Sequence, residues 1–157
     1  MIRPKKIVIW GHSLYSHTHS FIHYAFFKAF LFLGYETYWL DNAADLTGLD
    51  LSNSLFITEG QVDQNIPLRK DCQYVLHNCA QEKYRGLTTL SLQVFTADVP
   101  SKAQKIKPFV YFDGKTLYQP WATDLLPPEM PAAFHETGDD ACAEKTCVWV
   151  GTVGEGM

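Results

Sequence analysis

The strongest constraint on the fold is a short apolar run near the amino terminus, followed by a helical pattern and a second strand-like run. Residues 5–10 read KKIVIW, and such a continuous apolar run is typical of a strand buried on both faces of a parallel sheet. Residues 36–42 read ETYWLDN and predict a second strand. Between them, apolar side chains recur at helical spacing and predict one buried helix face: Ile22, Ala25, Phe26, Ala29 and Leu33. The three segments predict a β-α-β unit.

The alternation continues less regularly along the chain. Residues 54–60 (SLFITEG), 72–79 (CQYVLHNC) and 87–98 (LTTLSLQVFTAD) predict three further strands, and the helical pattern between these strands is weak. Two short aromatic runs flank Asp113-Gly114, which is a strong hairpin signal. We therefore expect an α/β fold with an open, mostly parallel Rossmann-like sheet, flanking helices and one added hairpin.

Composition narrows the class of protein. The chain has 157 residues, enough for one domain, and a formal net charge of −4 with no long run of Lys or Arg. These features argue against a nucleic-acid partner. No secretory signal is evident and no apolar stretch approaches the length of a membrane span, so a cytoplasmic protein is expected. The four cysteines are spaced C-x6-C and C-x4-C, unlike the tight knuckle of a zinc ribbon.

The strand pattern also suggests a division of the chain. Residues 1–118 hold all the strands described so far and are expected to form one Rossmann-like domain. Residues 119–144 contain many of the prolines and a cluster of acids, and they are expected to be a connector. Residues 145–157 are expected to begin a new buried strand with a glycine-rich turn. This last piece suggests the first strand of a second domain, so the fold is expected to be truncated.

Polar residues follow the predicted strands, and the carboxyl ends of strands are where open α/β sheets bind ligands. Gly11 and His12 follow the first strand, Glu59 ends the third and Asn78 follows the fourth. Such a row suits a sugar, which needs many hydrogen bonds. Asp, Asn and Gly also serve turns at strand ends, so each residue alone has a plain structural interpretation. We take Gly11, His19, Glu59 and Asn78 as candidate substrate-binding residues.

Four of the six histidines lie between positions 12 and 23. His19 and His23 have the i, i+4 spacing of a zinc pair, but the HEXXH pattern is absent and both fall at the margin of the apolar helix face. The sequence therefore favours no metal. His12 and His17 lie in the predicted loop after the first strand, and an imidazole with an ordinary pKa near 6.5 suits general base catalysis there. We take His12 as the first catalytic candidate and His17 as the second.

A dinucleotide site at the first turn is disfavoured, because GHSLYSHTH has a single glycine and lacks the G-x-G-x-x-G pattern. Gly151 and Gly154, in the GTVGEG stretch, are better candidates for binding a phosphate of a nucleotide cofactor or substrate. Trp121 is a candidate for stacking on a sugar ring, although packing would also account for it.

Several segments together resemble the N-terminal half of a GT-B-type glycosyltransferase. They are residues 6–42 from KIVIWGHS to YWLDN, then YVLHNC, LYQPWATDLLP and VWVGTVG. The chain is most similar to the spore-maturation-like group of sugar transferases in bacteria and large DNA viruses. The likeness spans nearly the whole chain, and QPWATDLLP, which is similar to an interdomain segment, is its most specific piece.

The resemblance implies transfer of a sugar from a nucleotide-sugar donor to a hydroxyl acceptor, without a resident cofactor. It implies that residues 1–118 provide the acceptor side, with His12 or His17 taking the acceptor proton if configuration is inverted. The donor would be held mainly by a C-terminal domain, so this chain alone is expected to be inactive or nearly so. The alternative is a non-catalytic α/β binding or interaction module that self-associates through the exposed interdomain face.

Overall fold

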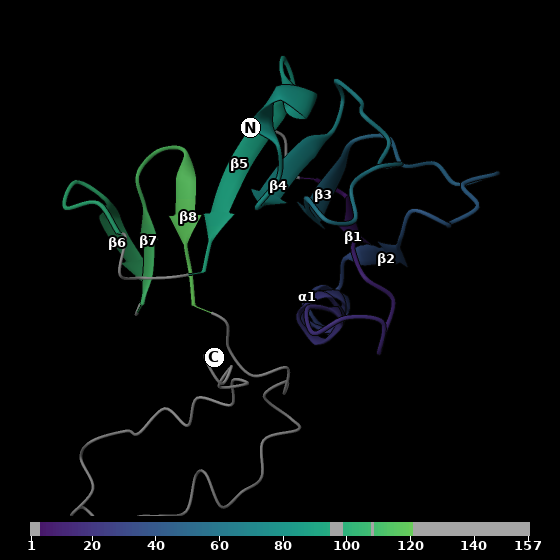
Figure 1. Ribbon diagram of the computed structural model, residues 1–157, viewed down its shortest axis with the longest axis horizontal. Helices are drawn as coiled ribbons and strands as arrows, with labels where there is room; N and C mark the ends of the chain where they lie inside the picture. Colours follow the sequence, from purple (N-terminus) through teal and green to yellow (C-terminus); the bar gives the residue numbers. More distant parts are fainter. Residues whose placement is uncertain (1–3, 95–98, 108, 121–157) are drawn as a thin grey trace, which may run out of the picture.

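The computed structural model describes residues 4–94, 99–107 and 109–120. These residues form one mixed sheet with strand order β2-β1-β3-β4-β5-β8-β7-β6 (Figure 1). Neighbouring strands from β2 to β8 in this order are parallel, and β8, β7 and β6 are antiparallel. The strands are β1 (Lys6–Trp10), β2 (Glu36–Leu40), β3 (Ser54–Glu59), β4 (Gln73–His77), β5 (Thr88–Gln93), β6 (Gln104–Lys107), β7 (Val110–Phe112) and β8 (Thr116–Tyr118). The expected open, mostly parallel α/β sheet is confirmed.

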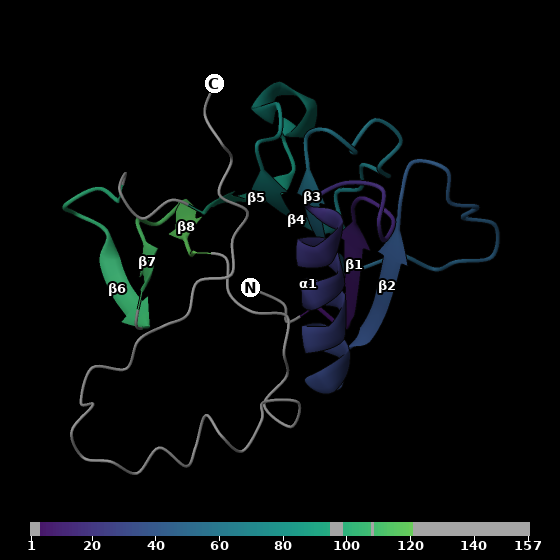
Figure 2. The same ribbon diagram turned by 60° about the horizontal axis from the view of Figure 1, so that its bottom comes forward.

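One α-helix, α1 (Ser20–Phe32), covers the β1–β2 part of one sheet face (Figure 2). Ile7 and Ile9 of β1 are buried beneath it, and phenylalanines of α1 pack against them. The helix ends in a Schellman motif, because Gly34 donates to the carbonyl of Leu31 and Tyr35 donates to that of Phe30. Gly34 has φ +80°, a conformation that glycine adopts without strain.

The opposite face is covered by loops and a short 3-10 helix, η1 (Gln81–Tyr84), and not by the flanking helices that the sequence predicted. Val8 and Trp10 of β1 point into this second core. Apolar side chains from the connections complete it: Leu51, Ile66, Cys72 and Tyr84. Within the described residues α1 is thus the only α-helix, which agrees with the weak helical pattern between the later strands. A loop between two strands can bury this face with only a few apolar side chains.

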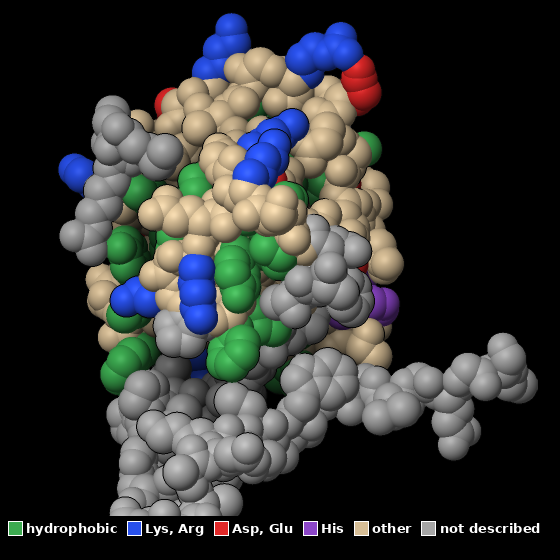
Figure 3. Space-filling model, turned by 90° about the vertical axis from the view of Figure 1, so that its left-hand side faces the viewer, with side chains coloured by type: hydrophobic (Ala, Val, Ile, Leu, Met, Phe, Trp, Pro, Cys, Tyr) green, Lys and Arg blue, Asp and Glu red, His purple; other side chains and the backbone are tan. Residues whose placement is uncertain are grey.

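The hairpin predicted around Asp113-Gly114 is confirmed as β7 and β8, and β8 extends the parallel sheet by pairing with β5. Strand β6 was not predicted, because all four of its residues are exposed and it has no buried face to produce an apolar pattern. Figure 3 looks onto this end of the sheet, where hydrophobic and lysine side chains share the surface. Ile106 and Phe109 are among the exposed apolar residues there.

The parallel strands bring several polar connections to one edge. The carboxyl ends of β1 to β5 and the start of α1 lie at the same end of the domain (Figure 2). No helix within the described residues has the length and hydropathy needed to cross a membrane.

Candidate functional site

The site begins where β1 leaves the sheet at Gly11, whose N–H still bonds to the carbonyl of Leu40 at 2.9 Å. A side chain at Gly11 would collide with the imidazole of His23, because a Cβ there would lie 2.2 Å from His23 Nδ1. The absence of a side chain therefore lets the His23 ring pack against the backbone. Gly11 was predicted to bind substrate, and the structure gives it this packing role and a place in the wall of a hollow described below.

His23 is the innermost of the clustered histidines, with 6% of its surface exposed. Its Nδ1 accepts a hydrogen bond from the backbone N–H of His12 at 2.9 Å. In the neutral ring the proton must then sit on Nε2. Burial lowers the pKa of His23 to about 4, so the ring is neutral near pH 7. His23 thus fixes the path of the chain at His12.

The carboxylate of Glu59 lies at the centre of the cluster, at the end of β3, with only 1% of its surface exposed. Its Oε2 lies 2.8 Å from Nδ1 of His19, which must donate because a carboxylate only accepts. The same oxygen lies 3.7 Å from Nε2 of His12 and 3.8 Å from Nε2 of His23. Oε1 is buried without a hydrogen-bond partner among the described residues. The carboxylate is therefore surrounded by imidazoles but only partly satisfied.

His77 joins the cluster from β4. It is the register partner of Glu59 across the parallel β3–β4 pair and is also buried. Burial lowers the pKa of His77. The chain then turns sharply at Asn78, which has φ +53° and is exposed at the rim. The Asn78 carbonyl would lie 2.4 Å from a Cβ on Gly60, so the two strand ends can approach this closely only with glycine there.

His12 and His17 stack, with ring centroids 4.1 Å apart, and His17 meets His19 edge-on at 5.1 Å. Burial lowers the pKa of His12, and neighbouring His17 adds to that effect. His12 is consequently neutral at pH 7 and able to accept a proton. Its Nε2 is buried and makes no hydrogen bond within the described part of the chain.

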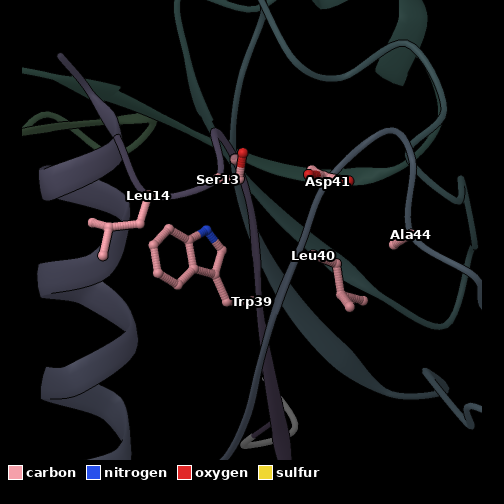
Figure 4. A pocket seen from close by; sticks show the side chains of 7 residues that line it. Ser13, Leu14, Trp39, Leu40, Asp41 and Ala44 are labelled. Atoms are coloured by element: carbon pink, nitrogen blue, oxygen red, sulfur yellow. The ribbon is translucent and has the colours of Figure 1, made fainter. Parts of the chain in front are cut away.

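A hollow of about 250 Å³ opens beside this cluster, between the loop after β1 and the end of β2 (Figure 4). Its wall includes Gly11, Ser13, Leu14, Trp39 and Asp41. The Trp39 indole lies next to Leu14, with its nitrogen on the side of Ser13. That nitrogen is a buried donor with no partner among the residues described. The hollow therefore offers an aromatic ring, an unused N–H, a hydroxyl and a carboxylate.

The structure gathers most of the predicted site residues at one edge. His12, His17, His19 and Glu59 lie in direct contact, and Asn78 lies on the neighbouring rim. Three further candidates, Trp121, Gly151 and Gly154, lie outside the described residues, as does most of the predicted connector and second domain.

The predicted site residues did not include His23, His77, Trp39 or Asp41. His77 and Asp41 had a usable signal, because each stands at the end of a predicted strand. Trp39 packs against Tyr24 and Phe27 and also lines the hollow.

Comparisons of the chain with protein-family models, with curated proteins and with solved structures found no match.

Proposed function

We propose that this domain is the acceptor-binding half of a GT-B-type glycosyltransferase, completed by a second domain that holds the nucleotide-sugar donor. One observation carries the proposal: the hollow at the carboxyl edge of β1 and β2, lined by Trp39, Ser13 and Asp41. Sugars are recognised by an aromatic ring against their C–H face together with donors and carboxylates for their hydroxyls. The unused indole N–H is a donor that a sugar hydroxyl would satisfy.

The two chain neighbours of His12, the candidate for activating an acceptor hydroxyl, line the hollow. Gly11 and Ser13 both line it, and His12 lies between them in the chain. His12 is neutral near pH 7 and has an unused nitrogen, as general base catalysis requires. His12 would take the acceptor proton as the oxygen attacks the anomeric carbon of the donor. His17, stacked on His12, would hold that ring in place.

Acceptor binding tests the proposal without requiring turnover or a second domain. We would record saturation-transfer-difference NMR spectra with hexoses, hexosamines, uronic acids and short oligosaccharides. At least one saccharide should bind, and Trp39→Phe should weaken it about 10-fold because the ring remains but the N–H donor is lost. Asp41→Asn should weaken it similarly, whereas Glu82→Gln, an exposed carboxylate on η1, should not.

The proposal is wrong if no saccharide in this panel binds, or if the Trp39 and Asp41 variants bind as well as the native chain. A panel of UDP-, GDP- and dTDP-sugars, assayed for hydrolysis and transfer, adds the catalytic step. Turnover that is abolished by His12→Ala would support the base role.

A second candidate is a non-catalytic interaction module, favoured by the apolar residues exposed at the end of α1. Leu31, Phe32 and Leu33 have 47%, 52% and 64% of their surface exposed. Such a row of apolar side chains is typical of a surface that binds another protein or a second copy of the chain. Self-association without saccharide binding would favour this candidate.

A further inference from the structure

We propose that His19, Glu59 and His77 form a binding site for a divalent transition-metal ion, with Zn²⁺ the expected metal. One ligand-type atom from each of these residues lies within 4.8 Å of the other two. Two imidazoles and one carboxylate are a ligand set that zinc proteins use when they leave a fourth position open. Mg²⁺ and Ca²⁺ prefer oxygen ligands and are not expected here.

The scaffold holds two of the ligands rigidly. Glu59 and His77 are register partners at the ends of adjacent parallel strands, so their side chains project from the same face. Both are buried, with 1% and 7% of their surface exposed. His19 stands at the N-terminal cap of α1 and closes over them. Ligands on strands keep their positions better than ligands on loops, which favours a defined coordination geometry.

The distances suit a small ion. Bonds of about 2.0–2.2 Å in a tetrahedral site place two ligand atoms about 3.3–3.6 Å apart. His19 Nδ1 and Glu59 Oε2 are now 2.8 Å apart with a proton between them, so replacing that proton by a metal requires these two atoms to separate by about 0.5–0.8 Å. The third ligand atom is within 4.8 Å and needs a modest rotation to complete the set.

The carboxylate supplies an independent reason to expect a cation. Glu59 is buried, and its ion-pair contacts among the described residues are with imidazoles and not with Lys or Arg. Its Oε1 has no hydrogen-bond partner in the described part of the chain. A buried carboxylate in this condition is unfavourable unless a cation or donor satisfies it. A bound dication would do so.

The two other nearby histidines have different roles. His23 is not a ligand, because its Nδ1 already accepts from the backbone of His12 and its Nε2 carries the proton. His12 Nε2 is 3.7 Å from Glu59 Oε2 and has no hydrogen-bond partner among the described residues. It is therefore placed to bond a water molecule in the fourth position. This proposal does not depend on the glycosyltransferase proposal.

The test uses the full chain stripped with EDTA and titrated with Zn²⁺ against a chromophoric chelator. Glu59→Gln and His77→Asn should each weaken the tightest site by about 100-fold or more, because the loss of even an outer-shell partner of a ligand costs about 10–100-fold. Glu82→Gln is the matched control for Glu59→Gln, since it makes the same change at an exposed carboxylate on η1, and it should leave the Zn²⁺ affinity unchanged. Circular dichroism in EDTA establishes that each variant is folded.

The absorption spectrum of bound Co²⁺ is a second measurement, and it does not respond to a change in the stability of the fold alone. The native chain should develop the strong visible absorption of tetrahedral Co²⁺, and Glu59→Gln should not. The proposal is overturned if the native chain shows no saturable Zn²⁺ site, or if Glu59→Gln and His77→Asn bind Zn²⁺ as tightly as the native chain. Metal binding without saccharide binding would support the metal site and contradict the glycosyltransferase proposal. Saccharide binding without metal binding would support the glycosyltransferase proposal and contradict the metal site.

Discussion

Replacing Gly11 with alanine should destabilise the domain through one contact, the collision with His23. The new Cβ would lie 2.2 Å from His23 Nδ1, 2.5 Å from Cγ and 2.6 Å from Cε1, where ordinary contact begins at 3.4 Å. The ring must therefore retreat by about 1.2 Å, the difference between 3.4 and 2.2 Å. That movement breaks the 2.9 Å bond that His23 accepts from the His12 N–H.

Two effects add to the loss of stability. Forcing an extra methyl into a packed site costs about 1–3 kcal/mol, and leaving the part-buried His12 N–H without its partner costs up to about 1–3 kcal/mol. We expect the free energy of unfolding to fall by about 2–6 kcal/mol, which corresponds to a drop in Tm of roughly 4–24 °C for a chain of this size. Urea unfolding followed by circular dichroism in EDTA measures the change.

A double-mutant cycle assigns this loss to the ring. If the collision is with His23, the double variant Gly11→Ala/His23→Ala should lose less free energy of unfolding than the sum of the two single variants, by about 1–3 kcal/mol. Gly86→Ala is the control, because a Cβ there meets nothing within 4 Å and only its φ of +77° opposes the change. Additive losses of stability would contradict a collision between Gly11→Ala and His23, and so would a Gly11→Ala variant that is no less stable than Gly86→Ala.

Two further predictions concern the second core. Tyr84→Phe removes a buried hydroxyl that donates to Asp63 Oδ2 at 2.6 Å, and it should lower the free energy of unfolding by about 2–3 kcal/mol. The control, Tyr38→Phe, removes a hydroxyl that donates to Glu36 at the surface and should change the free energy of unfolding by less than about 1 kcal/mol. Equal losses for the two variants in urea unfolding would contradict this prediction. Burial raises the pKa of the Cys72 thiol, so less thiolate is present at pH 8 than in a free cysteine. Iodoacetamide should therefore modify Cys72 slowly in the folded chain and faster once urea unfolds it. Equal rates of modification with and without urea, measured by tandem mass spectrometry, would contradict this prediction.

Much of the fold could be predicted because burial leaves a mark in the sequence. Strands β1 and β3 are buried on both faces and appear as apolar runs, β4 is buried on one face and partly buried on the other, and the Asp113-Gly114 pair marks its hairpin. Strand β6 left no such mark, because all its residues are exposed and it exists through pairing with β7. Its hydrogen bonds are made by the backbone, which carries no signal in residue type.

The site was predictable where one segment of sequence supplied several residues, and where a residue stands at the end of a predicted parallel strand, as Glu59 and Asn78 do. His12, His17 and His19 are close along the chain, so their grouping followed from the loop they share. The pairing of Glu59 with His77 depends on the register between β3 and β4, which sequence patterns do not give. The burial of His23 depends on the missing side chain at Gly11. Both are consequences of tertiary contacts between residues distant in sequence.

Two buried carboxylates, Asp63 and Glu59, differ in the partners that satisfy their oxygens, and this difference points to the site. Asp63, with 6% of its surface exposed, receives the Tyr84 hydroxyl and lies 3.4 Å from the Lys83 ammonium. Glu59 is buried more deeply and has an oxygen with no hydrogen-bond partner among the described residues. An unsatisfied buried polar group costs about 1–3 kcal/mol of stability. The fold therefore bears this cost at Glu59 but not at Asp63. A local conflict of this kind is typical of a place that binds something, and here it coincides with the imidazoles gathered at the carboxyl edge of the sheet.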